Sequence, residues 1–169
     1  MKKHISILTL FAVALSIAAF AQDKKPASPP AKAEGTIDGV KITIDYSQPS
    51  AKGRKIMGGL VPYGEVWRTG ANATTTIEFS ENVKIEGKAV AKGKYGLYTL
   101  PGENEWVIII NKGIKWGAFD YKQADDVVRV TVKPGKTASF VETFNIAVEK
   151  DKVVLNWENT SAAFKISKG

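Results

Sequence analysis

The sequence predicts an all-β fold, an antiparallel two-sheet sandwich with one long ordered loop, and two observations lead to this prediction. Short runs of alternating apolar and polar residues recur from residue 40 to residue 166, separated by turn-forming glycine, proline and asparagine residues. No window of about 11 residues has the apolar periodicity of an amphipathic helix. A sandwich, with a jelly roll as one variant, is favoured over a closed barrel because the runs are short and uneven.

The strands are expected where the alternation is clearest. The run 40–46 places its apolar residues on one face and Lys41, Thr43 and Asp45 on the other. The run 106–110 is apolar throughout, which indicates a central strand covered on both faces. The other strands are expected over residues 75–79, 83–85, 95–100, 127–132, 140–148, 153–157 and 163–166.

The first 21 residues have the features of a secretory signal peptide. A basic start precedes an apolar run, and Ala19 and Ala21 supply an A-x-A cleavage signal. An uncleaved membrane anchor is the alternative interpretation of the same run, which is near the lower length limit for a span. Residues 22–34, rich in Lys, Pro, Ala and Ser, are expected to form a disordered linker, and residues 35–169 a single β-sandwich domain.

We therefore expect an exported protein that is periplasmic or extracellular and has no transmembrane span after signal cleavage. Because the chain has no cysteine, it cannot be lipid-anchored through one, and disulfides and thiol nucleophiles are excluded. The one histidine, His4, lies within the expected signal peptide. A mature chain without His or Cys cannot run a Ser-His-Asp triad or hold a His-based zinc ion, so no metal or cofactor is expected.

The chain carries a net charge of +7, with its lysines spread among aspartates and glutamates. Such interspersed charge is typical of a solubilising surface, and no nucleic-acid partner is expected. Carboxylate, lysine and tyrosine chemistry remains open. The partner is expected to be a small molecule, a glycan or an envelope protein.

Residues 47–74 interrupt the alternation and are expected to form the long loop, which in a compact domain is often functional or a structural cover. In the functional interpretation its arginines bind a carboxylate or phosphate, its aromatic rings form a stacking wall, and its amide and hydroxyl groups orient a hydroxylated ligand. In the structural interpretation the arginines pair with buried carboxylates or loop carbonyls and pin the loop. The candidate ligand-binding residues are Arg54, Tyr63, Trp67, Arg68, Asn72 and Thr74.

A second aromatic patch is expected around Trp116, Phe119 and Tyr121. On a loop these rings could form a platform for a sugar, or they could plug the open end of the sandwich. In the strand that follows, Arg129 is either a buried partner for a carboxylate or simply an outward-facing residue.

Several of these segments together resemble the DUF2911 family of exported bacterial proteins, over essentially everything from Gly35 to the carboxyl terminus. The resemblance implies no mechanism, because the family has no assigned activity. It is carried by Tyr46-Ser47-x-Pro49, Lys52-Gly53-Arg54, Gly58, Val61-Pro62-Tyr63-Gly64, Trp67-Arg68-Thr69-Gly70-Ala71-Asn72, Thr74, Gly93-x-Tyr95-x-Leu97, Pro101 ahead of Trp106, Asn111-Lys112, and Trp116-Gly117 leading to Tyr121.

The sequence thus leads to one functional hypothesis and two alternatives. The first is a non-catalytic envelope protein, not an enzyme, that binds a ligand or another protein through residues 47–74. The second is an enzyme that acts on a glycan, which requires two carboxylates facing each other beside Arg54 or Arg68. The third is a purely structural accessory domain, in which internal salt bridges occupy both arginines.

Overall fold

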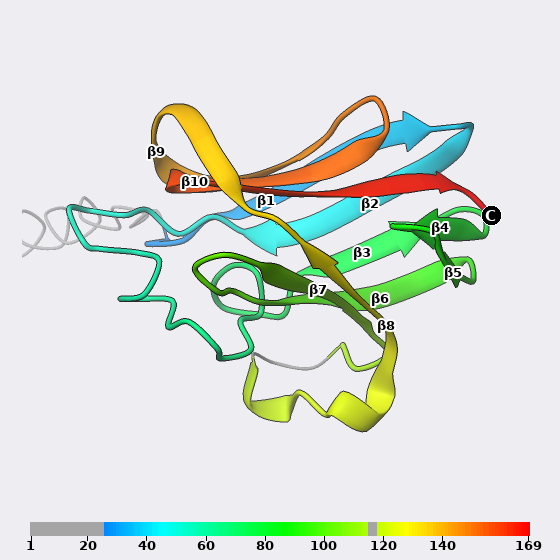
Figure 1. Cartoon of the computed structure of the whole chain (residues 1–169), viewed down its shortest axis with the longest axis horizontal. Coiled ribbons are helices and arrows are strands. Elements are labelled where there is room, and N and C mark those ends of the chain that lie inside the picture. Colours follow the sequence, from blue (N-terminus) through cyan, green and yellow to red (C-terminus); the bar gives the residue numbers. More distant parts are fainter. Residues whose placement is uncertain (1–25, 115–117) are drawn as a thin grey trace, which may run out of the picture.

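The computed structural model describes residues 26–114 and 118–169, and in this part of the chain nearly all regular structure is β (Figure 1). The two-sheet antiparallel sandwich expected from the sequence is confirmed. Two short 3-10 helices, η1 (Ala118–Asp120) and η2 (Gln123–Asp125), precede the eighth strand. The strands are β1 (Pro30–Ile37), β2 (Val40–Ser47), β3 (Thr76–Phe79), β4 (Val83–Ile85), β5 (Lys88–Val90), β6 (Gly93–Leu100), β7 (Trp106–Asn111), β8 (Asp126–Val132), β9 (Gly135–Val148) and β10 (Lys152–Lys168).

The six-stranded sheet has the order β1-β2-β3-β6-β7-β8, and the four-stranded sheet has the order β5-β4-β10-β9. The hairpin of β4 and β5 leaves the meander of the first sheet between β3 and β6 and joins the second. At one margin the backbone N–H of Ile146 donates to the Tyr46 hydroxyl, with an N to O distance of 3.1 Å. At the other margin Lys88 Nζ donates to the Arg129 carbonyl oxygen at 2.8 Å. The two sheets are therefore tied together at both sides.

The core lies between the sheets and follows directly from the alternation. Ile42 and Ile44 of β2 share one buried apolar cluster with Leu155 and Trp157 of β10, and all four are at most 2% exposed. Burial of such apolar side chains is the main favourable contribution to folding. The apolar run of β7 is also buried on the outer face of its sheet, where Ile109 is fully covered. The expected central strand is therefore confirmed.

The expected linker over residues 22–34 extends too far, because β1 begins at Pro30. The first inward residues of β1 are small because the strand passes close to β9. A Cβ on Gly35 would lie only 2.6 Å from Val148 Cγ1 of β9. Small residues such as Ala33 let β1 pass close to the neighbouring sheet. The same small residues, mixed with Lys and Pro, have the composition of a linker.

The runs expected at 153–157 and 163–166 are parts of one strand, β10. Its pairing with β9 shifts register on both sides of Glu158, which has a φ of 55°. β-Bulges of this kind reset which side chains face inward, so the alternation appears to stop although the strand continues.

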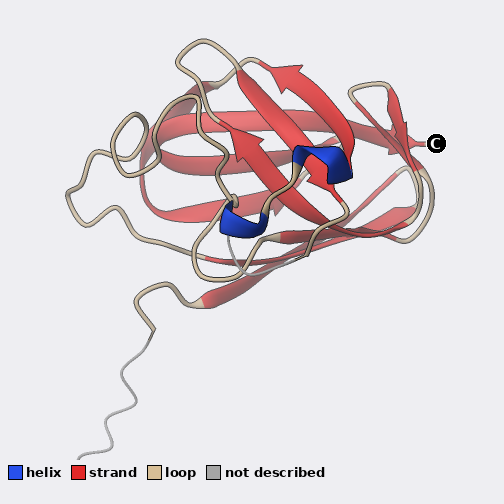
Figure 2. Ribbon diagram, turned by 90° about the horizontal axis from the view of Figure 1, so that it is seen from below, coloured by secondary structure: helices blue, strands red, loops and turns tan. Residues whose placement is uncertain are grey.

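Two irregular segments complete the domain. The long loop (residues 48–75) lies at the end of the sandwich opposite the carboxyl terminus (Figure 1). The segment with η1 and η2 crosses the outer face of the six-stranded sheet (Figure 2).

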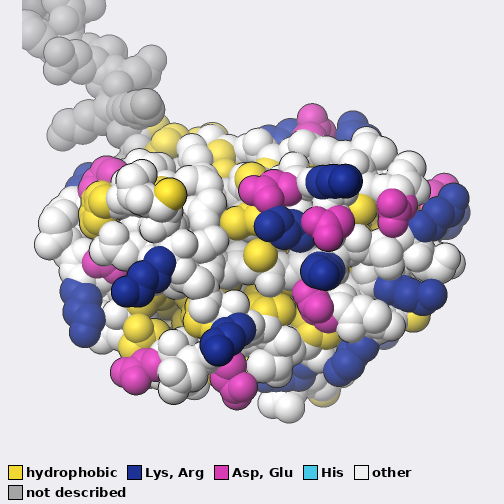
Figure 3. Space-filling model, turned by 45° about the horizontal axis from the view of Figure 1, so that its top comes forward, with side chains coloured by type: hydrophobic (Ala, Val, Ile, Leu, Met, Phe, Trp, Pro, Cys, Tyr) yellow, Lys and Arg dark blue, Asp and Glu magenta, His cyan; other side chains and the backbone are white. Residues whose placement is uncertain are grey.

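On the face in Figure 3, basic and acidic side chains alternate without a block of one sign. No helix of residues 26–114 or 118–169 is long and apolar enough to cross a membrane.

Candidate functional site

Arg54 holds the first half of the long loop in place. Its Nη2 donates to the Ser50 carbonyl oxygen at 2.7 Å, and its Nε donates to the Ala51 carbonyl oxygen at 3.0 Å. Ala51 in turn donates its N–H to the Glu142 carbonyl oxygen of β9 at 2.8 Å. Arg54 therefore binds loop carbonyls, as in the structural interpretation, although its side chain remains at the surface.

Trp67 anchors the second half of the loop. Its backbone exchanges hydrogen bonds with Thr99 of β6, at 2.7 and 2.9 Å. Its ring stacks on Trp157 with a centroid distance of 5.8 Å and meets Phe144 edge-on at 5.1 Å, while Nε1 donates to the Gly70 carbonyl oxygen at 3.1 Å. Trp67 is thus largely a core residue that fixes the direction of its neighbour, Arg68.

Arg68 is half-buried and is the residue of the loop whose bonding is incomplete. Its Nε is inaccessible to water and has no hydrogen-bond partner. It takes part in none of the ion pairs formed within the described part of the chain. A buried donor without an acceptor costs about 1–3 kcal/mol, so this arrangement calls for a compensating role.

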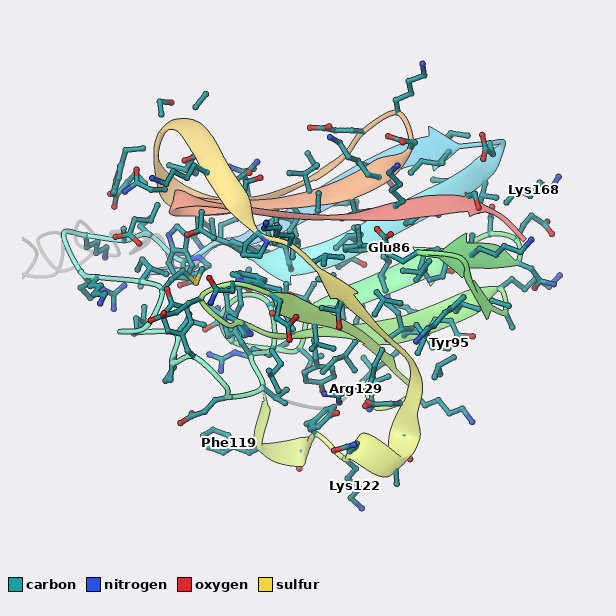
Figure 4. All side chains as sticks on the ribbon, viewed as in Figure 1. Glu86, Tyr95, Phe119, Lys122, Arg129 and Lys168 are labelled. Atoms are coloured by element: carbon teal, nitrogen blue, oxygen red, sulfur yellow. The ribbon has the colours of Figure 1, made fainter. Side chains whose placement is uncertain are left out.

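Arg68 lies in a groove of about 540 Å³, which we call the Arg68 groove. The segment 60–62 and Val66 supply an apolar wall, and Glu65 supplies a carboxylate. Phe119 also lines the groove and is 98% exposed. Figure 4 shows it projecting from η1 into solvent.

The residue after Arg68 has a strained backbone. Thr69 is fully buried and has a φ of 57°, in the left-handed region that β-branched residues rarely adopt. Its hydroxyl donates to Thr99 Oγ1 at 3.2 Å, and its carbonyl oxygen accepts from Thr75 Oγ1 at 2.7 Å. Such strain costs about 1–3 kcal/mol and occurs most often at binding and catalytic sites. Here it fixes the backbone that carries Arg68.

The six candidate residues do not line one pocket. Trp67 and Arg68 share the Arg68 groove, whereas Tyr63 lines a separate hollow and packs on Gly58. Asn72 is exposed, and its Nδ2 donates to the Ser28 carbonyl oxygen at 3.1 Å. Thr74 is buried and shares a 3.2 Å hydrogen bond with the Tyr98 hydroxyl. Of the six, Trp67 and Arg68 lie together in the Arg68 groove, and Thr74 lines a separate pocket on the outer face of the six-stranded sheet.

The residues of the expected aromatic patch have different positions. Trp116 lies outside the described residues. Tyr121, unlike the exposed Phe119, turns toward the sheet, where its ring centroid lies 5.2 Å from that of Tyr98. Phe119 and Tyr121 do not form a common platform.

Tyr121 belongs to a polar network on the outer face of the six-stranded sheet. Its hydroxyl donates to Asp126 Oδ2 at 2.7 Å, and Arg129 Nη1 donates to both of these oxygens at 2.8 Å. Asn111 Nδ2 donates to Asp126 Oδ1 at 2.8 Å. Arg129 lies between the sheet and the segment with η1 and η2 (Figure 4). Of the two roles that the sequence left open for Arg129, the structure shows the first, a partner for the buried carboxylate of Asp126.

The network shifts two pKa values. Burial, reinforced by the hydrogen bond to Asp126, raises the pKa of Tyr121 to about 12. The hydrogen bond to Asp126 also raises the pKa of Arg129. These groups bind one another and hold Tyr121, which follows η1, against the sheet.

The fold and the groove define an antiparallel β-sandwich whose longest loop, rather than its strands, forms the candidate site. The chain belongs to the DUF2911 family, described as proteins of unknown function, whose family model matches residues 28–166. The matched region includes β1 and the whole long loop. Neither the curated proteins nor the solved structures contain a match.

Proposed function

We propose that this protein is an exported, non-catalytic binding protein that takes its ligand in the Arg68 groove. The observation that carries the proposal is the buried Arg68 Nε, which has no acceptor. A ligand carboxylate or phosphate that enters the groove and displaces the atoms covering Nε would supply that acceptor in charge-assisted, bidentate hydrogen bonds. The strained Thr69 supports the proposal, because it holds the arginine in place before the ligand arrives.

The surroundings of Arg68 favour a ligand with one acidic group and an apolar substituent. Pro62, Val66 and the exposed Phe119 offer apolar surface along the groove. The Glu65 carboxylate in the same groove disfavours a ligand with several negative charges, because like charges repel at short range. The volume of about 540 Å³ lies within the range of small-molecule sites, about 300–1,000 Å³.

The export part of the proposal rests on the amino-terminal sequence. A basic start, an apolar run and the A-x-A signal at Ala19 and Ala21 support cleavage of a signal peptide, and delivery to the periplasm or beyond. Finding Gln22 at the amino terminus of the protein recovered from outside the inner membrane would support this. An intact amino terminus in the membrane fraction would instead indicate the uncleaved anchor.

The contacts support binding better than the two alternatives. Of the described residues that line the Arg68 groove, Glu65 alone carries a carboxylate, whereas glycoside hydrolysis normally uses two. A purely structural domain would use both arginines internally. Arg54 is used in this way, but the Arg68 Nε is not.

A ligand screen by thermal shift tests the proposal. We expect monocarboxylic acids with aliphatic or aromatic substituents to raise the melting temperature of the wild-type protein, since a ligand at 100 times its Kd adds about 2.7 kcal/mol. The Arg68→Met variant should lose the shift, and Arg54→Met, a matched change outside the groove, should retain it. A shift that both variants retain, or no shift with any acid, would contradict the proposal.

A further inference from the structure

A second pocket lies on the outer face of the six-stranded sheet, away from the Arg68 groove. The strand register brings its residues together: Lys32 of β1 lies opposite Asp45 of β2, and Asp45 lies opposite Thr76 of β3. Thr76 in turn lies opposite Gly96 of β6. These residues share the face of the sheet that points away from the core.

The pocket has a volume of about 470 Å³, and we call it the Thr76 pocket. Its polar lining includes Asp45, Thr76 and Lys94, and Ile114 contributes apolar surface. The residues that form it come from β1, β2, β3, β6, the loop that follows β7 and the end of the long loop, which contributes Ala73 and Thr74.

Gly96 makes the wall of this pocket possible. A Cβ at this position would lie 2.6 Å from the Gly113 carbonyl oxygen and 2.8 Å from Tyr98 Cε2. Because glycine has no side chain, the loop after β7 can cross directly over β6. This crossing brings Ile114, the residue after Gly113, to the pocket, where it remains partly exposed.

Thr76 is the unusual residue of the pocket. It is 8% exposed, and its hydroxyl oxygen is buried without a hydrogen-bond partner. The neighbouring Thr75 donates its hydroxyl to the Thr69 carbonyl oxygen at 2.7 Å. On β2, Thr43 donates its hydroxyl to Glu34 Oε1 at 3.4 Å. An unpartnered hydroxyl in a residue that lines a pocket is unfavourable in the empty protein, and a ligand that displaces the atoms covering it can satisfy it.

The charges of the pocket are balanced around Asp45. Its Oδ1 lies 3.3 Å from Lys32 Nζ, and its Oδ2 lies 3.4 Å from Lys94 Nζ. Each ammonium group has three donors, and the carboxylate can accept several hydrogen bonds, so both kinds of group retain capacity for a ligand. Glu78, which lies opposite Lys94 in the register, offsets the second lysine. A ligand with a net charge gains little here, whereas an uncharged ligand with several hydroxyl groups can use donors and acceptors together.

We propose that the Thr76 pocket is a second binding site, which takes an uncharged saccharide. Hydroxyl groups of the sugar hydrogen-bond to Asp45, Lys94 and the unpartnered Thr76 hydroxyl. The apolar C–H face of the sugar ring packs on Ile114. The pocket volume suits a ligand of one or two sugar rings, within the range of about 300–1,000 Å³ for small-molecule sites. The site does not share a residue with the Arg68 groove.

The test is an NMR titration of the purified, nitrogen-15-labelled protein. The probes are neutral monosaccharides and disaccharides, namely glucose, galactose, mannose, N-acetylglucosamine and their dimers, with inorganic phosphate as the charged comparison. Thr76→Val keeps the shape of the side chain but removes the hydroxyl, and Asp45→Asn removes the charge. Thr43→Val is the matched control, because it makes the same change on the same face outside the pocket.

We expect at least one saccharide to shift the amide resonances of β2, β3 and β6, and Thr76→Val and Asp45→Asn to weaken its binding by about tenfold or more. Thr76→Val should melt no lower than the wild type, since the hydroxyl it removes has no partner. Thr43→Val should bind the saccharide like the wild type, and so should Arg68→Met, which separates this site from the Arg68 groove. No shift with any saccharide, undiminished binding by Thr76→Val, or binding of phosphate in place of sugars would overturn the proposal.

Discussion

Trp67 of the long loop stacks on Trp157 of β10, with ring centroids 5.8 Å apart and an interplanar angle of 20°. The loop is thereby attached to the core of the sandwich. We predict that Trp67→Ala lowers the free energy of unfolding by about 3 kcal/mol, because a large aromatic side chain is removed from packed surroundings. Urea denaturation would measure this loss. Phe119→Ala is the control, and since Phe119 is 98% exposed it should change stability by less than about 0.5 kcal/mol.

The carboxylate of Asp126 accepts hydrogen bonds from Asn111, Tyr121 and Arg129. Its side chain is 8% exposed, whereas that of Arg129 is 32% exposed. We predict that Asp126→Ala destabilises the protein by about 2–3 kcal/mol, because it removes a buried carboxylate that accepts three hydrogen bonds and pairs with Arg129. The same denaturation measurement applies. A loss below about 0.5 kcal/mol would show that the network does not hold Tyr121 against the sheet.

The raised pKa of Tyr121 predicts a pH dependence of stability in the alkaline range. The folded pKa of about 12 lies above the ordinary value of 10.0, so the folded state favours the protonated hydroxyl. The stability that this group contributes is complete below pH 10 and is lost as the pH rises from 10 through about 12. Unfolding free energies measured across this interval should fall less steeply for Tyr121→Phe than for the wild type. Equal slopes would contradict the assignment.

The absence of a side chain at Gly96 lets the loop after β7 cross the sheet. In Gly96→Ala the new Cβ would lie 2.6 Å from the Gly113 carbonyl oxygen, so either the loop or the strand must shift. We predict a loss of about 1–3 kcal/mol and altered amide resonances in the loop. Gly135→Ala is the matched control, because the nearest atom to its Cβ would be 3.9 Å away. Equal stability of the two variants would contradict this account of the crossing.

The sequence predicted most strands because burial on one face imposes a period of two, as in β2. It failed where the side chains are small for reasons that lie elsewhere in the chain. Gly35 fits beneath Val148, which is 113 positions away in numbering, and no local pattern reports that contact. It also failed at Glu158, where bulges interrupt the alternation within β10.

The long loop could be selected from the sequence as a candidate site, but the roles of its residues could not. Arg54 and Arg68 look equivalent in the sequence, yet the first binds loop carbonyls and the second retains a buried Nε without a partner. What separates them is the position of Trp67 in the core, which is a tertiary contact. The residue types of a candidate site were therefore predictable from the sequence, and the positions of these residues relative to one another were not.

The polar network and the Thr76 pocket depend on register. A shift in the pairing of β7 with β8 leaves Val127 unpaired, so that Asp126 and Arg129 reach the same partner hydroxyl although three positions separate them. Alternation alone indicates that Asp45 points outward. Only the order of the strands places Thr76 beside it.

The central claim is that Arg68 is held in place for a ligand and does not stabilise the fold, and urea denaturation of Arg68→Met without any ligand tests it most directly. The substitution removes a buried Nε that has no acceptor and keeps most of the side-chain volume. We predict that its free energy of unfolding equals or exceeds that of the wild type, because an unsatisfied buried donor is unfavourable. A loss of about 2 kcal/mol or more would show that Arg68 stabilises the fold, and would contradict the account.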